Sequence, residues 1–210
     1  MYTPEMWNQI YRDGKNITWL RDKSTIFFSN ELKKYIDTSK SQKILDYGCG
    51  NGKIGMSFKC PNTSIELADI SNEQIAKINK EFSGQIPTYA VSYPNEIKNK
   101  YDCIICCNVF HHIEPKEWTV FLQQFYDLLN PKGRLLISGF DKTNTIFQSK
   151  GDIAPMAKHK VWSINNLIDN INPKQFKILD THINQLEYDM VAQKNKRVFA
   201  FRFIMLERNH

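Results

Sequence analysis

The stretch Ile44-Leu45-Asp46-Tyr47-Gly48-Cys49-Gly50-Asn51-Gly52 decides the fold of this 210-residue chain. A short apolar run ends on the carboxylate of Asp46, and a glycine-rich turn follows at once. The run predicts a buried strand, and the glycines let the backbone turn sharply and approach a ligand closely. In open α/β sheets, ligands bind beside the carboxyl ends of the strands. We therefore expect a binding site at the end of this first strand.

Strand and helix patterns alternate along the chain on both sides of this stretch. Apolar runs predict strands over 43–47, 64–69, 86–91, 101–107 and 134–140. Apolar residues at helical spacing predict helices over 5–12, 24–36, 114–129 and 163–171. Ser71 is placed to cap a further helix, and a polar loop joins two last strands, 176–183 and 198–206. The alternation indicates an α/β fold: a doubly wound, mostly parallel seven-stranded sheet with helices on both faces and an antiparallel C-terminal edge hairpin.

The composition is that of an ordinary globular domain, with 41% hydrophobic and 24% charged residues. The formal net charge of +6 allows anionic partners, but the basic residues are spread out, which favours a solvated surface over nucleic-acid binding. No run reaches the roughly 18 apolar residues of a membrane span, and no basic leader precedes an apolar core at the N-terminus. We expect a cytoplasmic monomer or homodimer without membrane attachment.

The five cysteines do not follow a disulfide or zinc-binding pattern. Cys103 and Cys106 have the spacing C-x-x-C, but strand residues three apart point to opposite faces of a sheet. We therefore expect buried, reduced thiols on this strand.

The glycine-rich turn also fits a second class of ligand. Gly50, Gly52 and Gly55 match the G-x-G-x-x-G pattern of dinucleotide-binding proteins. Asp46 opposes that assignment, because its carboxylate would place negative charge near two phosphates. A sulfonium ligand that carries an ammonium group has the opposite requirement, so dinucleotide binding ranks second.

Residues 45–52 resemble the first motif of the class I S-adenosylmethionine-dependent methyltransferases. The strand that ends in Asp69 is similar to the family's second motif, and later parts of the family are matched in order by 101–113, 128–137 and the closing strand pair. The resemblance covers most of the chain. It implies a single Rossmann-like methyltransferase domain over 1–210, of the small-molecule type, with S-adenosyl-L-methionine as the cofactor.

The resemblance also implies which residues bind the cofactor. Asp69 is expected to hold both ribose hydroxyls, for which a carboxylate has two acceptor oxygens. The family often carries an acidic residue after the third strand, whereas Ser92 and Tyr93 stand there in this chain. We expect Ser92 to hydrogen-bond the adenine and Tyr93 to pack on its face. The full predicted set is Tyr11, Trp19, Asp46, Gly48, Cys49, Gly50, Asp69, Ile70, Ser92, Tyr93 and Asn108.

The loop after the fourth strand, 108–115, is expected to face the transferred methyl group. Its Phe-His-His-Ile run is similar to the loop of many small-molecule methyltransferases, in some of which a histidine is the general base. A neutral hydroxyl is a poor nucleophile, and histidine, with an unperturbed pKa of about 6.5, suits the removal of its proton. His112 is the first candidate and His111 the second. The alternative is that one of them only caps the next helix or lines the cofactor pocket.

Other methyltransferase chemistries leave marks that this sequence lacks. The Asp/Asn-Pro-Pro-aromatic run typical of DNA amino methylation does not occur at Asn108. Cys106-Cys107 lacks the proline that usually adjoins the nucleophilic cysteine of carbon-5 pyrimidine methylation. No acidic residue after the fourth strand is placed to join Asp141 and Asn144 in a metal site, so we expect no metal.

The acceptor is expected to be a small molecule, with O-methylation of a hydroxyl as the first choice. Residues 1–40 are expected to form a helical lid, and 141–162 an excursion on the acceptor side. Basic residues of the excursion either suit a phosphate- or carboxylate-bearing acceptor, such as a nucleotide-linked sugar, or form a solvated loop: Lys142, Lys150, Lys158, His159 and Lys160. The alternatives from other classes are an RNA-modifying methyltransferase and a non-catalytic cofactor-binding partner subunit.

Overall fold

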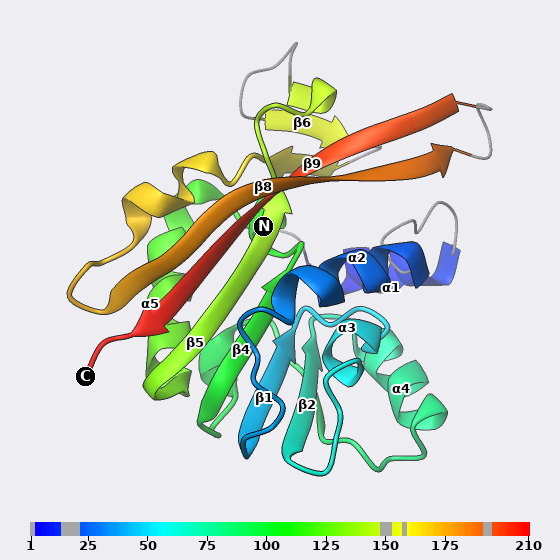
Figure 1. Ribbon diagram of the computed structural model, residues 1–210. Helices are drawn as coiled ribbons and strands as arrows, with labels where there is room; N and C mark the ends of the chain where they lie inside the picture. Colours follow the sequence, from blue (N-terminus) through cyan, green and yellow to red (C-terminus); the bar gives the residue numbers. More distant parts are fainter. Residues whose placement is uncertain (1–2, 14–21, 148–152, 157–158, 191–194) are drawn as a thin grey trace.

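The computed structural model describes residues 3–13, 22–147, 153–156, 159–190 and 195–210. Its centre is a seven-stranded sheet with the strand order β3-β2-β1-β4-β5-β9-β8 (Figure 1). The strands are β1 (Gln42–Tyr47), β2 (Thr63–Asp69), β3 (Thr88–Ala90), β4 (Tyr101–Cys107), β5 (Leu129–Phe140), β8 (Phe176–Met190) and β9 (Asn195–Arg208). The first five are parallel, and β9 pairs antiparallel with both β5 and β8. The predicted sheet and its edge hairpin are confirmed.

The strand order reverses beside β1, and this reversal positions the site. From β1 the chain moves outward through β2 to β3 and then crosses to β4 on the other side of β1. In open α/β sheets the ligand crevice lies at such a switch point, outside the carboxyl ends of the strands. Tyr47, Asp69 and Cys107 end the three strands concerned, at one edge of the sheet.

Helices cover both faces of the sheet, as Figure 1 shows. One face carries α2 (Asp22–Leu32), α3 (Lys53–Met56) and α4 (Asn72–Glu81). The other carries α5 (Trp118–Leu128) and two 3-10 helices, η2 (Pro94–Glu96) and η6 (Asn165–Asn170). Neighbouring strand residues alternate between the two apolar cores that result.

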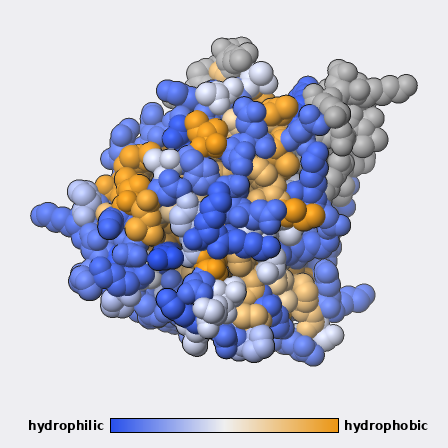
Figure 2. All heavy atoms as spheres, in the orientation of Figure 1, coloured by the Kyte–Doolittle hydropathy of each residue, from blue (hydrophilic) through white to orange (hydrophobic). Residues whose placement is uncertain are grey.

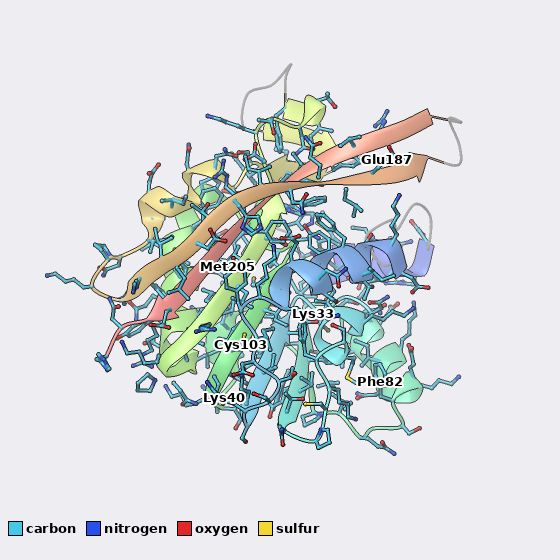
Figure 3. All side chains as sticks on the ribbon, viewed as in Figure 1. Lys33, Lys40, Phe82, Cys103, Glu187 and Met205 are labelled. Carbon is cyan, nitrogen blue, oxygen red and sulfur yellow. The ribbon has the colours of Figure 1, made fainter. Side chains whose placement is uncertain are left out.

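The thiols of β4 follow this alternation. Cys103 lies in the core beneath α2 (Figure 3), and Cys106 lies in the core beneath α5. Both are free and buried, and burial raises the pKa of each thiol above its ordinary value. The prediction of buried, reduced thiols on opposite faces is confirmed for this pair.

Several predicted boundaries are wrong. The segment predicted as a helix over 163–171 is the short 3-10 helix η6, in which Asn165 accepts from the Lys142 amide and Asn170 donates to the Asn166 carbonyl, so that asparagine side chains compete for backbone hydrogen bonds. The third strand is only Thr88–Ala90, since Pro87 before it has no N–H to donate. The helix predicted from 114 starts as the 3-10 helix η4 (Pro115–Glu117), which leads directly into α5. The two last strands are longer than predicted: β8 continues past 183 to Met190, and β9 begins before 198, at Asn195, and ends after 206, at Arg208.

The excursion 141–162 contains short elements that the sequence did not reveal. The 3-10 helix η5 (Thr145–Phe147) is followed by a small two-stranded sheet of β6 (Ile153–Met156) and β7 (His159–Trp162). Strand β7 lies against η3 (Phe110–His112), the turn that follows β4. The excursion therefore borders the loop that carries the two histidines.

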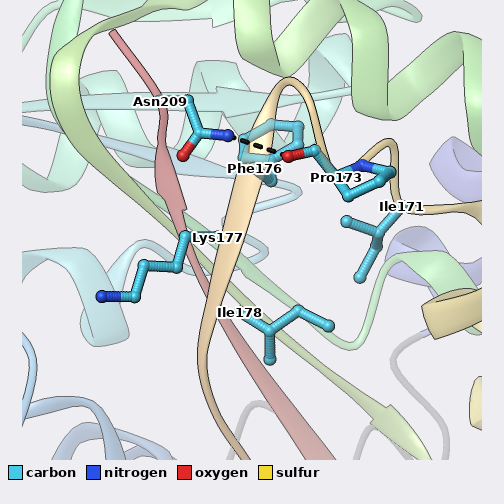
Figure 4. Close-up of a pocket in the computed structure, with 6 residues that line it drawn as sticks. All are labelled: Ile171, Pro173, Phe176, Lys177, Ile178 and Asn209. Atoms are coloured by element: carbon cyan, nitrogen blue, oxygen red, sulfur yellow. Dashed lines mark hydrogen bonds between the residues drawn. The ribbon is translucent and has the colours of Figure 1, made fainter.

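One surface hollow lies away from the predicted site. A shallow hollow at the start of β8 is lined by Ile171, Pro173, Phe176, Lys177, Ile178 and Asn209 (Figure 4). Because β8 runs parallel to β5, this hollow is at the opposite end of the sheet from the strand ends described above. On the face shown in Figure 2, apolar side chains form small, separate patches among polar ones. No described helix is long and apolar enough to cross a membrane.

Candidate functional site

The turn after β1 is held in a conformation that glycine favours. Gly48, Gly50 and Gly52 have φ angles of 70°, 57° and 73°, in the left-handed region where other residues are strained. The amides of Gly48 and Cys49 donate to the carbonyl oxygen of Ala68, at 2.8 and 2.9 Å. The turn is thereby fastened to the end of β2, which brings the ends of both strands together.

Asp46 and Asp69 lie side by side under this turn. Asp46 accepts a hydrogen bond from the Gly55 amide at 2.9 Å. Asp69 accepts one from the Gly50 amide through Oδ2 and one from the Ser71 amide through Oδ1, both at 2.9 Å. An ionised carboxylate has about four lone-pair sites. Each therefore keeps acceptor capacity for a ligand.

The two carboxyl groups are electrostatically unusual. Their side chains belong to residues only 2% and 4% exposed. Burial raises the pKa of Asp46 to about 7, aided by the charge of Asp69, and burial raises the pKa of Asp69 to about 6. Among the described residues, no Lys or Arg forms an ion pair with either. A ligand that brings hydroxyl donors and an ammonium group satisfies such a site, so the residues fit the adenosyl amino acid that the sequence predicts.

These pKa shifts predict opposite pH dependences for stability and for cofactor binding. Both folded pKa values exceed the unfolded value of about 3.9, so this contribution to the free energy of unfolding is full below about pH 4 and is lost as pH rises through 6 and 7. Hydroxyl donors instead prefer the ionised form of Asp69. Affinity for S-adenosylhomocysteine should therefore fall up to about tenfold per pH unit below about pH 6. Calorimetry between pH 5 and 7 checks this, and a flat affinity there would contradict it.

Asn108 follows β4 in a strained conformation. Its φ of 61° lies in the left-handed region, and its amide donates to the carbonyl oxygen of Ser138 at 2.9 Å. The side-chain Oδ1 is buried and accepts no hydrogen bond from any described residue. The unsatisfied buried acceptor points to a ligand that supplies a donor here.

The two histidines of η3 have different surroundings. His111 is 3% exposed, stacks on Phe140 with 4.4 Å between ring centroids, and keeps a buried Nδ1 without a partner among the described residues. Burial, assisted by the neighbouring His112, lowers the pKa of His111 well below 6.5, so its ring is neutral at pH 7. His112 is half-buried, with its ring centroid 4.1 Å from that of His111 and 4.9 Å from that of Trp7.

The N-terminal helix α1 (Pro4–Asp13) brings Tyr11 close to the same end of the sheet. Tyr11 is buried, and its carbonyl oxygen accepts from Lys77 Nζ at 3.3 Å on α4. Ile70 is half-buried directly after Asp69, and Cys49 is buried beneath the turn. Trp19, the remaining predicted residue from the N-terminal segment, lies outside the described residues.

The loop after β3 is organised by a side chain that the sequence prediction missed. The amides of Ser92 and Tyr93 both donate to Oε1 of Glu96, at 2.8 and 2.7 Å. The Tyr93 ring lies 5.5 Å from that of Phe121 on α5, so part of its surface is already packed. An acidic residue is therefore present in this loop, a few positions later than expected. The signal that could have revealed it is a glutamate three positions after Tyr93, in the first turn of η2.

On the acceptor side, Asp141 and Asn144 fasten the edge hairpin. Asp141 is fully buried and pairs with Arg202 on β9 at 2.9 Å, a partner that the sequence did not reveal. Asn144 bridges to the backbone of Ala200. Of the predicted basic residues, Lys142 and Lys160 are exposed. Lys150, Lys158 and the side chain of His159 lie outside the described residues.

Comparison with known proteins identifies the family. The profile of the family described as "Methyltransferase domain" matches residues 20–181. The mitochondrial ubiquinone biosynthesis O-methyltransferase of Schizosaccharomyces pombe is 25% identical over 138 residues, covering 62% of this chain and 49% of that protein. Ribosomal RNA small subunit methyltransferase C of Haemophilus influenzae is 31% identical over 149 residues, covering 64% of this chain and 45% of that protein. The chain thus spans about half the length of these curated relatives.

A solved structure shares the whole fold. The 1,6-didemethyltoxoflavin-N1-methyltransferase of Burkholderia thailandensis, crystallised with its substrate and S-adenosylhomocysteine, superposes with a TM-score of 0.70 at 16% identity. The match covers 99% of this chain and 87% of that one. With the family profile spanning most of the chain, the dinucleotide alternative is set aside. The chain belongs to the methyltransferase-domain family, the class I S-adenosylmethionine-dependent methyltransferases with a Rossmann-like fold.

Proposed function

We propose that this protein transfers the methyl group of S-adenosylmethionine to a hydroxyl of a small-molecule acceptor, with His112 as the general base. The observation that carries the proposal is the placement of two histidine rings, 4.1 Å apart, on the turn after β4, at the same end of the sheet as the buried carboxylates of Asp46 and Asp69. A base is useful for a hydroxyl acceptor, because the neutral hydroxyl is a poor nucleophile until its proton is removed. A neutral amine is already nucleophilic through its nitrogen lone pair.

The residues of the two strand ends have separate tasks in this proposal. Asp69 accepts from the ribose hydroxyls, Asp46 faces the ammonium group, and Asn108 offers its unsatisfied Oδ1 as a further acceptor. The left-handed glycines let the backbone of the turn come close to the ligand. When bound, S-adenosylmethionine supplies an electrophilic methyl group on its sulfonium.

The two histidines divide the acceptor chemistry between them. His112 is half-buried, so an acceptor hydroxyl has access to it, and it takes the hydroxyl proton as the oxygen attacks. His111 stays neutral because burial lowers its pKa, so it adds no positive charge that would oppose proton uptake by its neighbour. Alignment of the oxygen with the methyl group is the remaining contribution of the site. We further propose that residues 1–40 form the lid and 141–162 the acceptor wall of a single domain.

An acceptor screen tests the proposed function. The full chain is incubated with methyl-labelled S-adenosylmethionine and a panel of phenols, sugars, nucleotide-linked sugars and matched amines, and products are detected by mass spectrometry. Label transfer to hydroxyl compounds in preference to the matched amines supports the proposal. Transfer to amines alone would overturn O-methylation. Tight binding of S-adenosylhomocysteine without transfer to any acceptor would favour a non-catalytic partner subunit.

Replacement of His112 tests the base directly. His112→Ala should lower turnover about 100-fold, since general base catalysis typically contributes at least that much. The pH–rate profile of the variant should also lose its acid limb. His210→Ala, which removes an exposed histidine at the C-terminal end, is the control and should leave the rate unchanged. Near-normal turnover of His112→Ala would assign the base to another residue.

Ribosomal RNA is the second candidate acceptor, because several curated relatives are ribosomal RNA methyltransferases. The net charge of +6 is compatible with this choice. Binding to a ribosomal RNA fragment should then weaken steeply with salt, in proportion to the phosphates contacted. Absence of salt-dependent binding at low ionic strength would exclude RNA in favour of the small-molecule acceptor.

A further inference from the structure

Helix α1 is attached to the cofactor side of the site by polar contacts. Asn8, only 6% exposed, accepts a hydrogen bond from Ser71 Oγ at 2.6 Å. The amide of the same Ser71 donates to Asp69 Oδ1 at 2.9 Å. Arg12 adds an ion pair to Glu73 at 3.1 Å, one turn farther along α1. The helix is therefore attached to Ser71, whose amide also holds the Asp69 carboxylate at the end of β2.

The same helix reaches the acceptor side through an aromatic contact. The ring of Trp7 lies 4.9 Å from the ring of His112 at an interplanar angle of 83°, so the edge of one ring meets the face of the other. On its other side, His112 meets the ring of His111. The last torsion of a histidine side chain is broad and nearly two-fold, so rings packed against it decide which way its nitrogens point.

We propose that Asn8 and Trp7 are positioning residues through which α1 couples cofactor binding at Asp69 to the orientation of His112. Neither residue is assigned a contact with a reacting atom. Asn8 acts through Ser71 on the Asp69 carboxylate, and Trp7 acts on the ring of His112. The two residues are neighbours on helix α1. In this proposal, a movement of the segment from Asp69 to Ser71 is therefore passed through Asn8 to the indole of Trp7. Both the binding of the cofactor at Asp69 and the catalytic role of His112 rest on the proposed function.

The coupling follows from how the contacts are shared. α1 is short, and the described contacts that attach it run to α4 on one side and to His112 on the other. Loss of the Asn8 contact loosens the N-terminal part of the helix, although Arg12 and Tyr11 still attach its C-terminal part to α4, and Trp7 is then held less firmly against His112. Loss of the Trp7 contact loosens the same part of the helix and weakens the Asn8 contact in turn. Two contacts that depend on one docked helix are expected to be non-additive when they are removed together.

A double-mutant cycle with S-adenosylhomocysteine as the probe tests this inference. The full chain carries Asn8→Ala, Trp7→Leu or both, and calorimetry gives the dissociation constants. Each single variant should weaken binding about 3- to 10-fold, which matches loss of one hydrogen bond or packed ring. The double variant should bind S-adenosylhomocysteine about as tightly as the single variant that shows the larger loss of affinity. Trp7→Phe keeps a ring and should retain most of the affinity. Gln9→Ala, exposed on the same helix, should stay within about twofold of the parent chain.

A spectroscopic readout separates coupling from a loss of folding. In the parent chain and in Trp7→Phe, saturation with S-adenosylhomocysteine should shift the imidazole NMR signals of His112. In Asn8→Ala, that shift should be lost at saturation, although the chain remains folded. Effects that multiply in the double variant, or a full His112 shift in Asn8→Ala, would overturn the coupling. Failure of His112 as the base would instead appear as unchanged turnover of His112→Ala, with the coupling intact.

Discussion

Replacing Asp69 by alanine should weaken binding of S-adenosylhomocysteine about a thousandfold. A carboxylate that accepts from both ribose hydroxyls makes two charge-assisted hydrogen bonds of roughly 2 kcal/mol each, and 1.4 kcal/mol corresponds to a factor of ten. The burial of Asp69 adds to the effect, because no water is at hand to replace the lost acceptor for the hydroxyls. Calorimetry on the full chain gives the affinity. A loss of less than about tenfold would show that another residue holds the ribose.

The control for this variant must share the structural role of Asp69. Asp102 is a carboxylate that also accepts from a backbone amide, that of Lys43 at 2.8 Å, and from Asn130 at 2.8 Å. It lies near the start of β4, at the opposite end of the strand from the site. Asp102→Ala should lower the melting temperature as Asp69→Ala does, while its affinity for S-adenosylhomocysteine stays within about threefold of the parent chain. Equal losses of affinity in both variants would mean that destabilisation is the cause.

Replacing Gly48 by alanine should lower the free energy of unfolding by about 3 kcal/mol. The left-handed φ of 70° costs an alanine roughly 1 to 2 kcal/mol. The new Cβ would also lie 2.2 Å from Cγ2 of Val109, a β-branched side chain with little freedom to rotate away. Overpacking of this kind adds about 1 to 3 kcal/mol. Because Gly48 begins the turn that is fastened to the end of β2, cofactor affinity should fall about tenfold as well.

Two further variants separate the cost of backbone strain at Gly48 from the cost of overlap between the new Cβ and Val109. Gly84 has a similar φ of 66°, and a Cβ there would meet no atom within 4 Å, so Gly84→Ala should cost only about 1 kcal/mol. Adding Val109→Ala to Gly48→Ala removes the overlapping methyl group and should recover about half of the lost stability. Urea unfolding measures all four chains. Equal costs at Gly48 and Gly84 would show that Val109 has no part in the effect.

The order of secondary structure elements could be predicted because each depends on local patterns. Apolar runs bounded by glycine or polar residues predicted all seven strands of the sheet, and the left-handed glycines after β1 were marked by their residue type. The first and last residues of the helices and strands were predicted less well than their order. At 163–171 the apolar spacing predicted a helix, but short polar side chains that bind the backbone limited it to η6.

The partners of the site residues could not be read from the sequence. Asp46 and Asp69 were predicted as carboxylates at strand ends, but their burial, and the rise in pKa that burial causes, follow from how the turn folds over both strands. Burial of this kind depends on the path of the chain between distant residues rather than on the residue types. Glu96 is the exception, because its contact with the amides of Ser92 and Tyr93 is local and its position three residues after Tyr93 could have indicated it.

The sequence by itself determined the fold class, the family and the end of the sheet where the candidate site lies. These depend on repeating local signals: the period of apolar residues, the glycines of the turn and the acids that follow two strands. Only the tertiary structure decided that His111 is buried and neutral, that His112 meets Trp7, and that α1 joins Ser71 to this pair of rings. Those contacts link residues more than 60 positions apart, and no local pattern encodes which distant side chains share one environment once the chain has packed.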